Sequence, residues 1–183
     1  MRFANHPVRL RSLKPTGKLR HLFTRREAMA RLLADGWRRH TLHPEVARIE
    51  SLTAHLRKRG KLTVKLIEVG VANATAQERR TLGARRRVWV RRIELHVDGV
   101  PMIAARSATA ARHLKGPWRY LPRLQRRPMG EVLFADPIVA RSPRVFRVER
   151  YNGVGGLPSR RSLFIRQGAP LVVEEIFLGR LDR

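Results

Sequence analysis

The chain has 183 residues, no cysteine and a formal net charge of +26, with 40 Lys and Arg against 14 Asp and Glu. This length favours one domain with a sizeable core, and the missing cysteines exclude disulfides and thiolate chemistry. No apolar run is long enough to span a membrane, so we expect a cytoplasmic protein. The positive charge favours anionic partners or substrates, but it does not indicate sequence-specific binding of nucleic acid.

The N-terminal segment is basic and differs from the rest of the chain. Residues 1–26 contain eight Lys and Arg and no acidic residue, and Pro7, Pro15 and Gly17 interrupt them. They lack the apolar stretch of a secretory signal. An organellar transit peptide would share this composition. We nevertheless predict that residues 1–22 form a disordered basic arm and that residues 23–183 form a single domain.

Two helices and a strand are expected next. Residues 24–35 have apolar residues near helical spacing and end at Gly36, and a longer helix is expected from Pro44 to Arg59. Residues 61–71 alternate between apolar and polar side chains, which predicts a strand. Residues 72–86 are polar, and we expect a loop there.

The segment from Arg87 to Thr109 is expected to be a β-hairpin, because two runs rich in β-branched and apolar residues flank Asp98-Gly99. At a period of two, one face of the first run is apolar except for Arg91. A guanidinium cannot lose its charge by a pKa shift, so burial without a partner is costly. Either Arg91 lies at the open end of the strand with its head in water, or an anion meets it inside. The other members of that face are Trp89, Ile93, Leu95 and Val97.

The remaining segments complete a mostly antiparallel sheet. Residues 112–129 are expected to be an irregular covering segment, and residues 130–134 a single helical turn. A strand over residues 138–150 is interrupted by Pro143, and residues 152–158 are expected to be a flexible glycine-rich loop. A second hairpin is predicted from residues 160–167 and 171–178. Helices followed by about five strands favour the α+β class.

Two neighbouring carboxylates in the last strand, Glu174 and Glu175, lie on opposite faces and each has apolar neighbours. Buried carboxylates usually have a partner or a function. The alternation of side chains does not decide which of the two has a functional role.

Short segments spread over about residues 44–179 carry a resemblance to a known family. They are Ser51-Leu52-Thr53, Trp89-Val90-Arg91, Ala105-Arg106-Ser107, Gly116-Pro117-Trp118, Pro128-Met129-Gly130, Leu133-Phe134, Arg160-Arg161-Ser162 and Glu175-Ile176-Phe177-Leu178. In this order and spacing they resemble the chorismate lyase (chorismate–pyruvate lyase) family. Each segment is weak alone, whereas the ordered set is specific.

The resemblance implies a six-stranded, mostly antiparallel sheet with helices packed on one side, enclosing a buried ligand pocket. It implies a lyase that cleaves chorismate to 4-hydroxybenzoate and pyruvate in the first step of ubiquinone biosynthesis, with no metal and no organic cofactor. By resemblance, Arg91 binds the ring carboxylate with help from the backbone N–H of Met129. Glu175 approaches the oxygen at ring position four, and Leu52 belongs to the apolar wall.

These residue types suit the chemistry. A bidentate arginine fixes the plane of a ring carboxylate better than a lysine does. A carboxyl group in an apolar setting has a raised pKa, so Glu175 could donate a proton to the departing ether oxygen; alternatively, it only holds the phenol oxygen. The chain departs from the family's usual pattern at Glu68, at Ala110 and at Gln125, where members usually have glycine.

Two other functions remain as alternatives. The first is a non-catalytic domain of the same fold that senses small carboxylates. The second is a basic nucleic-acid-binding protein, although the few aromatic residues are not interleaved with the basic runs as such proteins require. We expect a monomer whose partners are chorismate and 4-hydroxybenzoate, with no specific nucleic acid.

Overall fold

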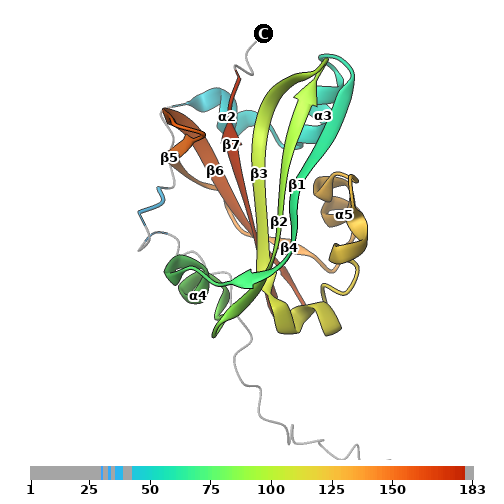
Figure 1. The fold of residues 1–183 in the computed structure, drawn as a ribbon, viewed down its shortest axis with the longest axis vertical. Helices are drawn as coiled ribbons and strands as arrows, with labels where there is room; N and C mark the ends of the chain where they lie inside the picture. Colours follow the sequence, from blue (N-terminus) through green and yellow to red (C-terminus); the bar gives the residue numbers. More distant parts are fainter. Residues whose placement is uncertain (1–29, 31–32, 34–35, 39–42, 180–183) are drawn as a thin grey trace, which may run out of the picture.

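The computed structural model describes residues 30, 33, 36–38 and 43–179. Their centre is a curved antiparallel sheet of seven strands in the order β1-β2-β3-β7-β6-β4, with β5 also paired to β6 (Figure 1). The strands are β1 (Leu62–Asn73), β2 (Arg87–Val97), β3 (Val100–Ala110), β4 (Ala140–Arg141), β5 (Val145–Tyr151), β6 (Val154–Arg166) and β7 (Ala169–Phe177). The expected α+β class and mostly antiparallel sheet are confirmed. The sheet has seven strands, one more than the six that were expected.

The helical elements are all short. They are α2 (Pro44–Arg48), α3 (Leu52–Arg57), α4 (Ala76–Leu82) and α5 (Met129–Ala135), with 3₁₀ turns η1 (Ala111–Lys115) and η2 (Leu121–Leu124). Among the described helices, none is long and apolar enough to cross a membrane. Ala30 and Leu33 are helical, but most of the helix expected over residues 24–35 lies outside the described residues, as does the arm at residues 1–22.

The central hairpin forms as predicted, with β2 and β3 joined by Asp98 and Gly99 at φ values of 49° and 83°. Two consecutive residues in the left-handed region match the right-handed twist of the flanking strands. The Asp98 carboxylate also accepts a hydrogen bond from the Lys61 backbone N–H at 2.9 Å. This contact ties the turn to the start of β1.

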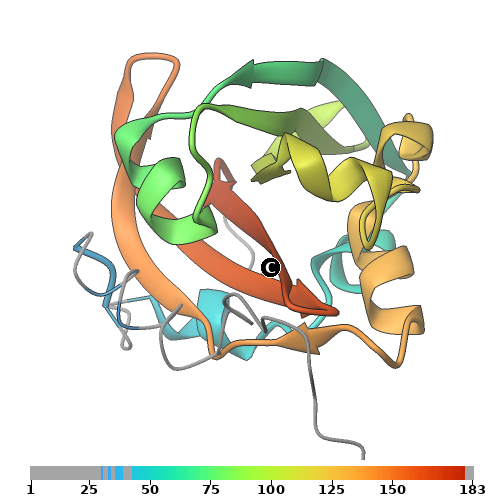
Figure 2. The same ribbon diagram turned by 90° about the horizontal axis from the view of Figure 1, so that it is seen from below.

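Helices cover both faces of the sheet, so the expectation that they pack on one side is wrong. On one face, Leu82 of α4 packs with Val88, Val90 and Trp37 in one core cluster. On the other face, α2, α3, α5 and the 3₁₀ turns cover the sheet, and Figure 2 shows its strong curvature. Side chains of both orientations along β2 are therefore buried, because the curved sheet is covered twice.

The helix predicted from Pro44 to Arg59 is in fact two helices. Ile49 and Ser51 are extended, and the Ser51 hydroxyl accepts a hydrogen bond from Ala54 N at 3.3 Å, which caps α3. A serine that satisfies the first N–H groups of a second helix favours a break over a continuous helix. The break brings Leu52 to the start of α3.

Two segments expected to be loops are regular. Residues 76–82 form α4, because Thr75 and Glu78 make a reciprocal capping box and Gly83, at φ 58°, ends the helix. The expected glycine-rich loop is a tight turn at Asn152-Gly153, with φ values of 47° and 85°, followed directly by β6. This turn pairs β5 with β6 in a third hairpin.

Candidate active site

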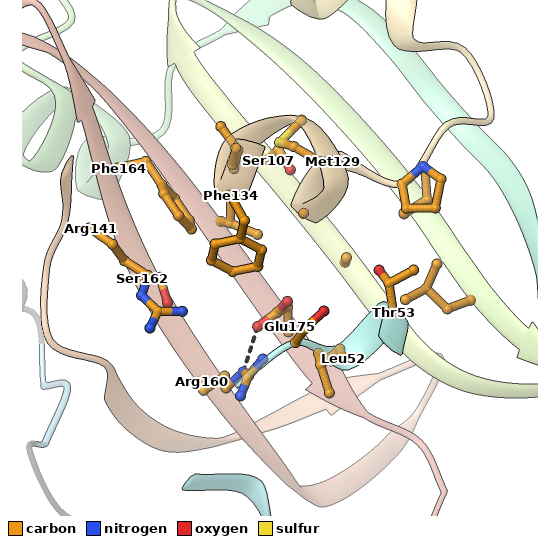
Figure 3. Close-up of a pocket in the computed structure, with 18 of the residues that line it drawn as sticks. Leu52, Thr53, Ser107, Met129, Phe134, Arg141, Arg160, Ser162, Phe164 and Glu175 are labelled. Carbon is orange, nitrogen blue, oxygen red and sulfur yellow. Dashed lines mark hydrogen bonds and ion pairs between the residues drawn. The ribbon is translucent and has the colours of Figure 1, made fainter. Parts of the chain in front are cut away.

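A cavity of about 60 Å³ lies on the face of the sheet covered by α3 and α5 (Figure 3). It lies between two apolar core clusters, because Trp89 belongs to one cluster, Ile93 belongs to the other, and Arg91 lies between them on β2. A wider hollow of about 600 Å³ shares Thr53, Phe134 and other wall residues with it. The cavity thus adjoins this wider hollow between α3 and α5.

Strand register places the predicted site residues on one face of the sheet. One row across four neighbouring strands is Arg91, Ser107, Val173 and Ser162, and the next row is Ile93, Ala105, Glu175 and Arg160. The small side chains of Ala105, Ser107 and Ser162 leave space where larger residues would complete the core. Arg91 and Glu175 are two strands apart, about 10 Å across the strands, and one row apart, about 7 Å along them.

Arg91 is 1% exposed, so the interpretation of an edge arginine with its head in water is wrong. Its Nε and Nη2 donate to the Gln125 carbonyl at 3.2 and 2.7 Å, and Nη2 also donates to the Arg127 carbonyl at 2.9 Å. Burial lowers the pKa of Arg91. Within the described part of the chain, no carboxylate pairs with it, so the guanidinium is a buried cation suited to an anionic ligand.

Gln125 holds Arg91 through a strained backbone. It has φ 44° and ψ −114°, a conformation that favours glycine, yet its carbonyl accepts two of the hydrogen bonds from Arg91. Glutamine in place of the family's usual glycine therefore still holds the Arg91 guanidinium, but its backbone is strained next to the cavity.

We expect Gln125→Gly to raise the free energy of unfolding by about 1 kcal/mol, because glycine adopts this conformation without a Cβ clash. Urea unfolding of the two proteins measures the change. Gln125→Ala is the matched control and should show no gain, since alanine keeps the Cβ. A loss of stability in the glycine variant would contradict the strain.

Glu175 faces the same cavity but is paired with a different arginine. Arg160 Nε donates to its carboxylate at 2.6 Å (Figure 3), and Arg160 Nη1 donates to the carbonyls of Val46 and Ile49 at 3.2 and 2.6 Å. Arg160 thus connects the C-terminal end of α2 to β7. The Glu175 carboxylate therefore already accepts a hydrogen bond from an arginine in the free protein.

Glu174 lies on the opposite face of β7, where it forms ion pairs with Arg161 and Arg147. Leu52 is 4% exposed at the start of α3, and Met129 is 6% exposed at the start of α5; both line the cavity. The four residues proposed from the sequence, Leu52, Arg91, Met129 and Glu175, therefore meet in one place. Glu68 does not: it forms an exposed ion pair with Arg92 at 3.5 Å, outside the cavity wall.

Sequence reasoning missed a second group of charges in the cavity wall. Arg141 and Arg144 both bind Glu50, with Nη2–Oε2 distances of 2.8 and 3.0 Å. These two guanidiniums, Arg144 first, lower the pKa of the Glu50 carboxyl to about 2. Arg141 follows no motif and Arg144 follows Pro143, so the sequence offers no pattern that places either of them in a pocket.

Comparison with known proteins identifies relatives over most of the chain. The family model described as "Chorismate lyase" matches residues 45–181. A protein of Albidiferax ferrireducens named "Probable chorismate pyruvate-lyase" is 36% identical over 149 residues, covering 69% of this chain and 76% of that protein. One of the same name from Aromatoleum aromaticum is 36% identical over 155 residues, covering 75% of this chain and 84% of that protein.

A solved structure shares the fold at low sequence identity. The C-terminal domain of the histidine utilization repressor from Pseudomonas syringae pv. tomato aligns with a TM-score of 0.50 and 15% identity, covering 67% of this chain and 95% of that chain. This likeness concerns the architecture alone.

Proposed function

Because the chain belongs to the chorismate lyase family, we propose that it cleaves chorismate to 4-hydroxybenzoate and pyruvate, the first step of ubiquinone biosynthesis. The observation that carries this proposal is the buried guanidinium of Arg91. It lines a cavity with apolar walls and has no carboxylate partner among the described residues. The ring carboxylate of chorismate supplies the missing anion, and the carbonyls of Gln125 and Arg127 fix the plane of the guanidinium.

The reaction needs orientation and the movement of one proton. The ether C–O bond breaks, the ring loses one hydrogen and becomes aromatic, and the departing enolpyruvate gains a proton to become pyruvate. No oxidant or further reactant is required. A site that holds the ring in a reactive geometry can supply roughly 7–11 kcal/mol of the barrier at best. Arg91 holds one end of the ring, and Met129 and Leu52 contribute to the walls.

Glu175 acts at the other end of the ring. Its carboxylate, held by Arg160, accepts a hydrogen bond from the hydroxyl at ring position four. Of the two roles expected for Glu175, we adopt holding this oxygen, because the carboxylate already acts as a hydrogen-bond acceptor toward Arg160.

Purified protein incubated with chorismate tests the proposal directly. We expect equal amounts of 4-hydroxybenzoate and pyruvate. The first product is measured by the absorbance of its phenol, and the second by coupled enzymatic reduction of pyruvate. Incubation without protein controls for spontaneous breakdown of chorismate. Failure to accelerate product formation over this control would reject the proposed activity.

Residues 1–22 are expected to be dispensable for this activity, because their composition is that of a disordered arm and the family match begins at residue 45. Deleting them and measuring kcat/KM with chorismate should give a change of less than about tenfold, or about 1.4 kcal/mol of barrier. A larger loss would show that the arm takes part in the site. Thermal unfolding of the shortened chain separates this outcome from loss of the fold.

A further inference from the structure

A pair of arginines lies in the cavity wall at a distance from Arg91. Arg141 is in β4 and Arg144 precedes β5, whereas Arg91 is in β2, and β3, β7 and β6 lie between β2 and β4. The two side chains are largely buried, with exposed fractions of 28% for Arg141 and 12% for Arg144. The cavity wall therefore carries cationic groups from strands that lie far apart in the curved sheet.

We propose that Arg141 and Arg144 form a second anion subsite, which binds the carboxylate of the enolpyruvyl side chain of chorismate. This inference rests on the proposed lyase activity. Chorismate is a dianion, so Arg91 alone leaves its second carboxylate unmatched, and Arg160 in the same wall is already paired with Glu175. An unpaired charge there is costly, and a second arginine group removes that cost.

The geometry of Glu50 supports an exchangeable subsite. Glu50 lies in the bend between α2 and α3, its side chain is 74% exposed, and both arginines bind its carboxylate. A carboxylate so exposed can rotate into water while another carboxylate takes its place. Glu50 thus occupies the two guanidiniums in the way that the substrate's carboxylate would.

The two arginines retain binding capacity beyond Glu50. Arg144 Nε is buried and makes no hydrogen bond within the described structure. Arg141 donates to Glu50 through Nη2, and its guanidinium carbon lies 5.2 Å from the centre of the Phe134 ring, which holds it against the cavity wall (Figure 3). A planar guanidinium held over a ring in this way is suited to bidentate binding of a carboxylate.

The subsite has a chemical consequence that separates substrate from product. Chorismate carries both carboxylates, whereas 4-hydroxybenzoate carries only the ring carboxylate and reaches no further than Arg91 and Glu175. Arg141 and Arg144 should therefore contribute to recognition of chorismate and not of 4-hydroxybenzoate. They act as specificity-determining residues that favour the dianion.

The test measures KM for chorismate and the inhibition constant of 4-hydroxybenzoate in Arg141→Gln and Arg144→Gln. We expect KM to rise about tenfold to a hundredfold, the effect of losing a hydrogen bond to a charged group, while the inhibition constant changes less than about twofold. Arg92→Gln is the matched control. It removes the same charge from an ion pair on the opposite face of the sheet and should leave both constants unchanged.

Glu50→Gln gives a result of opposite sign. Removing the competing carboxylate should lower KM for chorismate by severalfold and leave 4-hydroxybenzoate unaffected. If Glu50, Arg141 and Arg144 only stabilise the bend between α2 and α3, Glu50→Gln should instead raise KM for chorismate. Arg144 contributes to that bend, because it also donates a hydrogen bond to the Glu50 backbone carbonyl at 3.1 Å. Arg141 has no such backbone contact among its hydrogen bonds to Glu50, so its variant tests the subsite without disturbing that bend.

The outcomes separate the inference from the activity on which it rests. A wild-type protein that does not cleave chorismate rejects the proposed function, and the subsite with it. If the wild-type protein cleaves chorismate, two results for the arginine variants overturn the subsite alone. One is that the variants behave like Arg92→Gln. The other is that they lose binding of chorismate and of 4-hydroxybenzoate equally.

Discussion

Arg91→Ala is expected to reduce kcat/KM for chorismate by about a hundredfold to several thousandfold. The ring carboxylate would enter the cavity without its partner, and leaving one member of a buried ion pair unmatched costs about 3–5 kcal/mol. Arg91→Lys should recover only part of the loss, because an ammonium lacks the planar fork that binds the Gln125 and Arg127 carbonyls. Steady-state kinetics and binding of 4-hydroxybenzoate measure both effects.

The stability of the same variants provides an independent readout. In the free protein the Arg91 guanidinium is buried with no carboxylate partner among the described residues, and burial lowers its pKa. Arg91→Met removes this buried charge but also removes the donors of the Gln125 and Arg127 carbonyls, so the two effects on the unfolding midpoint oppose each other while activity is abolished. Addition of 4-hydroxybenzoate should raise the unfolding midpoint of the wild type and not that of Arg91→Met, and an equal rise in both would contradict the anion site.

Glu175→Gln is expected to lower kcat by about tenfold to a hundredfold, the effect of losing a charge-assisted hydrogen bond to the ring oxygen. The glutamine keeps the shape of the side chain but not its charge, so binding of 4-hydroxybenzoate should fall much less than turnover. Rapid-quench measurement of a single turnover, together with a titration of 4-hydroxybenzoate, distinguishes chemistry from binding.

Glu174→Gln is an unusually close control. Glu174 and Glu175 are neighbours in β7, and each is paired with an arginine of β6, Arg161 and Arg160 respectively. Both variants leave a buried arginine without its carboxylate, so both should lose stability. Only Glu175→Gln should lose turnover, and an equal loss of turnover in the two would assign the effect to the ion pairs.

The elements with strong local signals were predictable from sequence. The Asp98-Gly99 turn between alternating runs located the central hairpin, and the alternation placed Arg91 on the inner face. Asn152-Gly153 carries the same turn signal, yet the glycines that follow it favoured a loop interpretation, and the β5–β6 hairpin was missed. The sequence Thr75 to Glu78 also has the spacing of a capping box, which predicts the start of a helix, although residues 72–86 were expected to be a loop.

Other features depend on contacts between distant segments, so no local pattern could supply them. The choice between Glu174 and Glu175 required the family resemblance, because alternation gives each of them apolar neighbours on its own face of the strand. The pairing of Glu175 with Arg160 depends on the register of β6 against β7. Likewise, the group of Glu50, Arg141 and Arg144 joins segments about ninety residues apart in the chain.

The position of the cavity between two core clusters links ligand occupancy to the stability of the whole domain. Residues on either side of Arg91 belong to separate apolar clusters, and both clusters contribute side chains to the wall of this space. A flat aromatic acid bound there would fill the space and contact both clusters, as a core side chain would. A ligand at a hundredfold excess over its Kd adds about 2.7 kcal/mol to the free energy of unfolding. Retention of product would then protect the folded chain from unfolding while it delayed the next turnover.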